Sequence, residues 1–283
     1  MKSFHRRSSR PATEPIVHTV SPVERHGLLR ADSLLVDQGL APSRTAARVL
    51  IEAGRVSWAG GPITKPAQTL AASVPLSVSA DDEADRFVSR GGFKLAGALR
   101  ASAISVSGRV ALDVGQSTGG FTDCLLQAGA SRVIGVEVGH GQIHPRLAAD
   151  PRCVSLEGIN ARYLVAADLG EHFPPAGFDL IVCDASFISL TLLLPQWSAL
   201  LAKDGDVPGG DILALVKPQF EVGAKGLSKG GIVRDAALYA VVEARLRDSA
   251  AACRLKVQGW FDSPITGTDG NREFFIWMQH EHD

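Results

Sequence analysis

Two lysines and two acidic residues stand beside apolar stretches of this sequence and could move a proton together. Lys217 follows "DILALV" and Asp184 follows "FDLIVC", while Lys94 lies in "GGFKL" and Glu273 in "GNREFFIW". A lysine held by a carboxylate can take or polarise a proton, because burial and the neighbouring charge tune its affinity for that proton. Each residue also has an ordinary alternative. A lysine at a strand end can reach water, and Asp184 could cap a helix near 188–202.

A glycine-rich turn in "LDVGQSTGG" is typical of a site for a bound cofactor. An apolar strand ends at Asp113, and a turn with Gly115, Gly119 and Gly120 leads into a helix. In open α/β sheets ligands bind outside the carboxyl ends of strands, near such turns. The next apolar strand ends at Glu137, and an acid there suits hydrogen bonds to ribose hydroxyls.

Three cofactors compete for this turn. A phosphate-binding loop must end in Gly-Lys-Ser/Thr, and the turn lacks that lysine. A dinucleotide site needs Gly-x-Gly-x-x-Gly, a spacing that Gln116 and Ser117 break. S-adenosylmethionine has no pyrophosphate and needs one tight turn and an acid for its ribose. The pattern therefore favours S-adenosylmethionine over a dinucleotide, and a purely structural turn stays open.

The elements that position these residues alternate between apolar strands and helical stretches. The strands are "RVALDVG", "RVIGVEVG", "CVSLEG", "FDLIVCDAS" and "DILALVK", a pattern that predicts a parallel α/β sheet over residues 87–283. The last two, "KVQGWFDSPI" and "REFFIWMQH", have no helix between them. They must pair as a hairpin or place one strand antiparallel in the sheet. Because Asp113, Glu137, Asp184 and Lys217 end strands of this sheet, we expect them at one rim.

A small α+β unit is predicted over residues 29–80, after a tail over 1–28 and before an acidic linker over 81–86. "RADSLLVDQGL" predicts a helix that ends at Gly39. "SRTAARVLIEAG" predicts a helix that begins after Ser43 and ends at Gly54. Short strands are expected at "RVSW", "ITK" and "VPLSVS".

Charge is distributed unevenly along the 283 residues. Residues 1–66 carry ten basic and five acidic side chains, a balance of +5 that leaves −6 for the rest of a chain with net charge −1. This basic N-terminal region indicates binding to nucleic acid or to another anionic surface. The alternative is a charged surface that is simply exposed to solvent.

Composition argues against several other classes of protein. The four cysteines form no Cys-x-x-Cys pair and the eight histidines no metal-ligand spacing, so we expect reduced thiols and no metal. No apolar run reaches the ~18 residues of a membrane helix. We therefore expect a cytoplasmic protein without a membrane partner. The oligomeric state is open, with a monomer favoured because heptads are not visible.

Several long motifs resemble the TlyA (hemolysin A) family over residues ~29–279. They are "VSRGGFKL", "LDVGQSTGGFTDCLLQAGA", "VGHGQI", "INARYL", "CDASFISL", "LVKPQFE", "KGGIVRD" and "SPITGTDGNREF". The resemblance implies an S-four RNA-binding domain followed by an FtsJ-like, Rossmann-like methyltransferase domain. It also implies S-adenosyl-L-methionine as cofactor and 2′-O-methylation of ribose, usually of cytidine, in ribosomal RNA or ribosomal subunits. The chain departs from the usual Val-Asn-Gly of the S-four hairpin with Trp58-Ala59-Gly60.

The resemblance also implies roles for particular residues. An FtsJ-like Lys-Asp-Lys-Glu tetrad maps onto Lys94, Asp184, Lys217 and Glu273. The implied cofactor-binding residues are Asp113, Gly115, Ser117, Gly119, Gly120, Phe121, Glu137, Val138, Asn160 and Asp184. The implied RNA-binding residues are Arg30, Ser43, Arg44, Arg48, Arg55, Lys65 and Arg90.

Two alternatives to a methyltransferase come with this family. Its older name suggests a membrane-lytic haemolysin. The sequence argues against this alternative, because it contains no strongly amphipathic cationic helix. The other alternative is an RNA-binding assembly factor without turnover, against which the four matching tetrad residues argue. The sequence does not identify the modified nucleotide or the ribosomal subunit that carries it.

Overall fold

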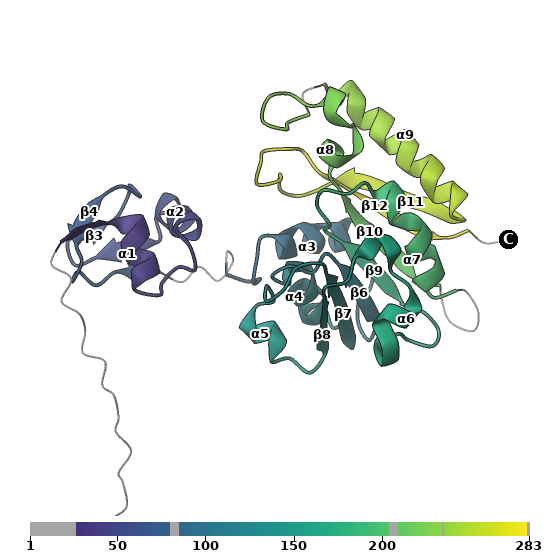
Figure 1. The fold of residues 1–283 in the computed structure, drawn as a ribbon, viewed down its shortest axis with the longest axis horizontal. Helices are drawn as coiled ribbons and strands as arrows, with labels where there is room; N and C mark the ends of the chain where they lie inside the picture. Colours follow the sequence, from purple (N-terminus) through teal and green to yellow (C-terminus); the bar gives the residue numbers. More distant parts are fainter. Residues whose placement is uncertain (1–26, 80–84, 204–208, 234, 282–283) are drawn as a thin grey trace, which may run out of the picture. The chain divides into compact units, whose positions relative to one another are not determined.

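The computed structural model describes residues 27–79, 85–203, 209–233 and 235–281. The chain divides into two compact units, Met1–Asp81 and Asp82–Asp283. Figure 1 shows the helices and strands of both units. The tail predicted over 1–28 lies outside the described residues except for its last two positions. Of the linker predicted over 81–86, only residues 85 and 86 are described.

The first unit packs two helices against short strands. Its described elements are β1 (Leu28–Arg30), α1 (Ala31–Asp37), α2 (Arg44–Glu52), β2 (Val56–Trp58), β3 (Gly61–Pro62), β4 (Thr69–Ala71) and β5 (Ser77–Val78). Helix α2 begins as predicted, because the Ser43 hydroxyl accepts a hydrogen bond from the Ala46 amide at 3.2 Å. Both helices are followed by glycines with φ of +71°, Gly39 and Gly54, which only glycine adopts without strain.

Strand pairing in this unit differs from the prediction in two places. The strand predicted at "ITK" is wrong, since β3 is Gly61–Pro62 and pairs with β2. Ile63 instead turns inward, fully buried in the core of the unit. The prediction also missed β1 and β4, which pair antiparallel from Leu28↔Ala71 to Arg30↔Thr69.

The second unit is built on a mostly parallel sheet, which confirms the predicted α/β fold. Its described strands are β6 (Val110–Val114), β7 (Arg132–Glu137), β8 (Cys153–Glu157), β9 (Leu180–Cys183), β10 (Asp211–Val216), β11 (Leu255–Asp262) and β12 (Phe274–His280). Their order in the sheet is β11-β12-β10-β9-β6-β7-β8. Strand β12 is antiparallel to both of its neighbours, so the last two strands place one antiparallel member inside the sheet.

Helices cover both faces of this sheet (Figure 1). One face packs against α3 (Gly91–Ser102), α4 (Gly120–Gln127) and α5 (Pro145–Ala148). The other packs against α6 (Ala166–Leu169), α7 (Leu194–Leu200) and α9 (Ala237–Ala252). This double cover explains why the strands are apolar on both sides, with all six residues of β10 buried. The short helix α8 (Pro218–Glu221) follows β10 directly.

The described residues contain neither a helix that could span a membrane nor a cluster of metal ligands. No helix among them has the length and apolarity needed to cross a membrane. In the same part of the chain, no group of three or more His, Cys, Asp or Glu side chains could hold a metal ion. The four cysteines are free thiols, with Cys124 and Cys183 buried.

Candidate active site

The carboxyl ends of neighbouring strands bring the predicted charged residues to one edge of the sheet. Strand β6 lies between β7 and β9, with Val114 opposite both Val136 and Cys183. The residues that come next along these strands are therefore adjacent at the rim. Asp184 follows β9, Glu137 ends β7, and Lys217 lies one residue beyond β10.

Lys217 is held by three oxygen atoms at this rim. Its Nζ lies 2.7 Å from Asp184 Oδ1, in an ion pair whose side chains are 11% and 23% exposed. The same Nζ donates to the Ser186 hydroxyl at 2.7 Å and to the Asp184 carbonyl oxygen at 3.3 Å. Lys217 is therefore a nearly buried, fixed cation and does not extend freely into water.

A second ion pair joins α3 to the sheet. Lys94 Nζ lies 2.6 Å from Glu273 Oε2, and the two side chains are 11% and 3% exposed. Burial raises the pKa of Glu273 above its usual range, an effect that the nearby Lys94 ammonium opposes. The Lys217 and Asp184 charges also act on Glu273, with opposite signs.

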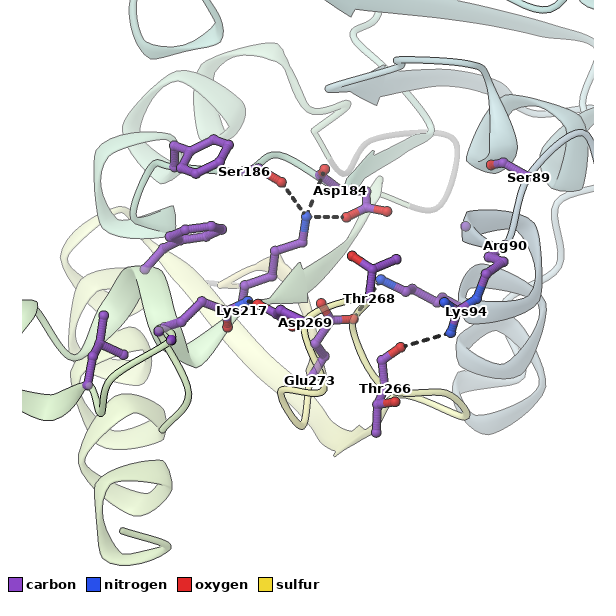
Figure 2. A pocket seen from close by; sticks show the side chains of 17 residues that line it. Ser89, Arg90, Lys94, Asp184, Ser186, Lys217, Thr266, Thr268, Asp269 and Glu273 are labelled. Carbon is purple, nitrogen blue, oxygen red and sulfur yellow. Dashed lines mark hydrogen bonds and ion pairs between the residues drawn. The ribbon is translucent and has the colours of Figure 1, made fainter. Parts of the chain in front are cut away.

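Both ion pairs line one cavity of about 760 Å³ (Figure 2). Its walls include the four predicted tetrad residues and Arg90, whose guanidinium donates to the Thr266 carbonyl at 3.3 Å. The structure therefore brings together residues that lie far apart in the chain, around a space large enough for a nucleotide-sized ligand.

Two further cavities adjoin the glycine turn. One, of about 220 Å³, lies between the turn and the start of α3 and is lined by Ser89, Gly91, Gly120 and Phe121 among others. The other, of about 520 Å³, is lined by Glu137, Val138, Asn160 and Ile188 among others. All three cavities share Asp184 and Ser186, so these two residues stand where the spaces meet.

The backbone of the turn needs glycine at Gly115. This residue has φ of +79°, and a Cβ atom there would lie 3.1 Å from Ala185 Cα. The loop that carries Asp184 can therefore pass close to the turn. Ser117 also has a positive φ, of +48°, and its amide donates to Glu137 Oε2 at 3.0 Å. Glu137 thus lies beside the turn, with its second oxygen accepting from the Gly139 amide at 2.8 Å.

Two of the predicted cofactor-binding residues, Asp113 and Gly119, are not among the residues lining these cavities. Asp113 is fully buried and accepts a hydrogen bond from the Thr122 hydroxyl at 2.7 Å, which ties β6 to α4. Burial raises the pKa of Asp113 to about 7. Gly119 is the N-cap of α4 with φ of +92°, a left-handed conformation that favours glycine. Asp113 and Gly119 therefore contribute to the structure of the turn and do not line the cavities.

The predicted RNA-binding residues of the first unit differ in their exposure and in their hydrogen bonds and ion pairs within the protein. Arg30 and Arg44 both bond to the carboxylate of Asp32, which is 1% exposed, and they lower its pKa. Arg48 is exposed and lies 3.8 Å from Glu52, and Lys65 is exposed. Arg55 donates to the Ser79 carbonyl at 3.0 Å. Ser43 caps α2, as described above. Arg48 and Lys65 are therefore the cations of this set best placed to meet a ligand.

Sequence reasoning missed several residues that line the 760 Å³ cavity, the largest of the three described above. Ser186, Gln219 and Asp269 are polar members of its wall, and Gln219 donates to Asp269 at 3.1 Å. Ser186 and Gln219 each lie two residues beyond a tetrad residue that directly follows a strand. Proximity to Asp184 and Lys217 was thus the available signal.

Family models match both units of the chain. The model described as FtsJ-like methyltransferase matches residues 87–280, and the model described as S4 domain matches residues 29–73.

Individual relatives cover nearly the whole chain. A Mycobacterium tuberculosis protein named 16S/23S rRNA (cytidine-2′-O)-methyltransferase TlyA is 44% identical over 260 residues, 90% of this chain and 91% of its own. Hemolysin A of Brachyspira hyodysenteriae is 35% identical, over 87% of this chain and 98% of its own. A solved structure from Streptococcus thermophilus, described as a suspected hemolysin, has a TM-score of 0.69 and 36% identity. It covers 90% of each chain.

Proposed function

The chain belongs to the TlyA family of FtsJ-like methyltransferases, and from this premise we propose a specific reaction for its site. The enzyme transfers a methyl group from S-adenosyl-L-methionine to the ribose 2′-hydroxyl of a cytidine in ribosomal RNA. The Mycobacterium tuberculosis relative, which matches this chain over 91% of its own length, is named for this activity.

One observation carries the proposal. The Lys217–Asp184 and Lys94–Glu273 pairs line the largest cavity, and that cavity shares Asp184 and Ser186 with the two cavities at the glycine turn. A ribose in the first space and a methyl donor in the other two would meet at these residues. A lytic function, which the names of some relatives suggest, makes no use of this convergence.

The residues at the turn fit S-adenosyl-L-methionine. The 520 Å³ cavity offers apolar walls at Val138 and Ile188 and the carboxylate of Glu137 for ribose hydroxyls, and Asn160 also lines it. The 220 Å³ cavity lies past Gly115, where a Cβ atom would approach Ala185, and suits the methionine part. Bound there, the cofactor supplies a methyl group on a sulfonium centre, an electrophile that needs no metal.

The tetrad residues would handle the proton of the attacking hydroxyl. Ribose hydroxyls hold their proton at neutral pH, so the oxygen must be relieved of it as it attacks. Lys217, fixed by Asp184, is placed to take or polarise that proton. Lys94 and Glu273 would orient the ribose from the other side of the cavity. Holding the oxygen in line with the methyl group should supply much of the acceleration.

The first unit would bind the RNA through its exposed cations. Arg48 and Lys65 are exposed cations that suit phosphate contacts, and Arg90 lines the substrate cavity itself. Such contacts recognise folded RNA through its phosphates and shape. Because the substrate is ribosomal RNA, we place the enzyme in the cytoplasm, acting on ribosomal subunits.

A labelling experiment tests the proposal. The protein is incubated with S-adenosyl-L-methionine carrying a tritiated methyl group and with ribosomal subunits from a strain that lacks the enzyme. Label in ribosomal RNA is expected, in a form resistant to alkaline cleavage at the modified residue. Label in protein, or no label, would contradict the proposed reaction.

A further inference from the structure

The Lys217 ammonium donates two hydrogen bonds and forms one ion pair. The hydrogen bonds go to the Ser186 hydroxyl at 2.7 Å and to the Asp184 carbonyl at 3.3 Å, and the ion-pair partner, Asp184 Oδ1, lies 2.7 Å away. An ammonium group has three donors and no acceptor. Ser186 is thus the side chain to which Nζ donates a hydrogen bond.

The three partners differ once Lys217 loses its proton. A neutral amine keeps two N–H groups and gains one lone pair. The ionised carboxylate and the peptide carbonyl only accept hydrogen bonds, so they retain the two N–H groups. A serine hydroxyl can both accept and donate. Of the three partners, Ser186 alone can therefore turn its O–H toward the lone pair.

The lone pair marks the direction from which Lys217 can receive a proton. Because Ser186 lies in that direction, its hydroxyl is placed to deliver a proton to Nζ. Ser186 is exposed and lines all three cavities, so a ribose in the largest cavity can reach it.

The loop around Ser186 is fixed on both sides. Ala185, before it, lies against the glycine turn at Gly115. Phe187, after it, has a positive φ of +64° and is 89% exposed, and its ring lies 5.1 Å from the ring of Phe220. A left-handed backbone at a phenylalanine is unfavourable and marks a segment whose geometry is imposed by its surroundings.

We propose that the Ser186 hydroxyl relays the proton from the ribose 2′-hydroxyl to Lys217, an inference that rests on the proposed methyl transfer. The bond between O2′ and the methyl carbon forms while the carbon–sulfur bond breaks, and the bonding pair stays on sulfur. The proton of O2′ passes to Ser186 Oγ, and the proton of Ser186 passes to the lone pair of Nζ. Lys217 ends as an ammonium and later returns its proton to water.

The test compares the unaltered full-length enzyme with Ser186→Ala, Ser186→Thr and a matched control. Ser198→Ala removes the same atom from a hydroxyl that donates to the Cys253 carbonyl in another part of the fold. Single-turnover methylation of ribosomal RNA is followed in mixtures of light and heavy water, and calorimetry measures cofactor and RNA binding. A step that moves two protons together gives a curved dependence on the deuterium fraction, and a one-proton step gives a straight line.

The relay predicts a rate about 10²-fold lower for Ser186→Ala, within the usual range for a positioned proton-transfer group. Binding stays unchanged, and the curved deuterium dependence becomes linear. Ser186→Thr keeps its hydroxyl and most of the rate, and Ser198→Ala matches the unaltered enzyme. An unaltered rate in Ser186→Ala, or a linear dependence in the unaltered enzyme, overturns the relay alone. If the unaltered enzyme leaves RNA unmethylated, the proposed function fails as well.

Discussion

Lys94 of helix α3 and Glu273, the residue just before strand β12, form an ion pair with an N–O distance of 2.6 Å, and both side chains are nearly buried. Such a pair contributes little net stability, because desolvation of two charges offsets their attraction. The pair lines the cavity of about 760 Å³, which is why we include it in the proposed mechanism.

Removing one member of this pair should destabilise the protein far more than replacing both. We expect Lys94→Ala to cost about 3–5 kcal/mol, since it leaves the Glu273 carboxylate buried without a partner. The pKa of Glu273, already raised by burial, should rise further, so the loss should be smaller at low pH, where the carboxyl is neutral.

Thermal melting at pH 5 and pH 8 checks this prediction, with Lys94→Met/Glu273→Gln as the matched double variant. The double variant should recover most of the stability while methyl transfer stays low. A double variant with full activity would remove the pair from the catalytic mechanism.

Glu137 provides a prediction about cofactor binding. Glu137→Ala should weaken binding of S-adenosyl-L-methionine by roughly 1–3 kcal/mol, the usual effect of losing a charged hydrogen-bond partner. Calorimetry on the full-length protein measures this, with Glu171→Ala, an acid in the 3₁₀ turn Gly170–His172, as the control. Equal affinities of the Glu137 variant and the unaltered protein would exclude Glu137 from the site.

Asp113 should make stability fall as pH rises. Its folded-state pKa of about 7 lies above the ordinary value of 3.8. The neutral carboxyl therefore stabilises the fold at low pH, and this contribution is lost as pH rises through about 7. The difference corresponds to at most about 4 kcal/mol. Asp113→Asn keeps an uncharged group of the same shape. Between pH 5 and pH 8 the melting temperature of the cofactor-free protein should fall more than that of Asp113→Asn. Parallel curves for the two proteins would mean that Asp113 is ionised in the fold.

RNA binding should depend on the exposed cations of the first unit. Arg48→Ala and Lys65→Ala should each weaken binding to ribosomal RNA and reduce the slope of log affinity against log salt by about one. Lys256→Ala, which removes the same charge from the edge strand β11, serves as control.

Arg30→Ala and Arg44→Ala should also destabilise the unit, because each removes a partner from buried Asp32. Unchanged slopes for Arg48→Ala and Lys65→Ala would place the RNA contacts elsewhere.

The residues at the carboxyl edge of the sheet could be predicted, because the end of an apolar strand is recognisable in the sequence. Asp184, Lys217 and Glu137 follow or end such strands, and parallel strands bring their ends together. The side chain of Asp113 could not be oriented in the same way. A strand buried on both faces shows no alternation of polar and apolar residues, so its pattern does not tell which face a given residue occupies.

Partner choice and loop geometry depend on contacts that no local pattern encodes. Motif matching placed Lys94 and Glu273 in one set, but the sequence did not pair them with each other. Ser186 lies in a loop held by Gly115 on one side and Phe220 on the other. Only the folded chain shows that its hydroxyl meets Lys217. Strand β3 was missed for a different reason: its two residues are too few to show a periodic pattern.

The central claim is that methyl transfer to a ribose 2′-oxygen occurs beside Lys217. Its most direct test supplies S-adenosyl-L-methionine with a ¹³C-labelled methyl group and identifies the labelled nucleosides of ribosomal RNA by mass spectrometry. With the unaltered enzyme we expect labelled 2′-O-methylcytidine. With Lys217→Ala we expect a loss of ~10²–10⁴-fold at nearly unchanged binding of cofactor and RNA. Lys217→Arg should fail almost as badly, because a guanidinium stays protonated. Label on a base or on protein, or an active Lys217→Arg enzyme, would contradict this account.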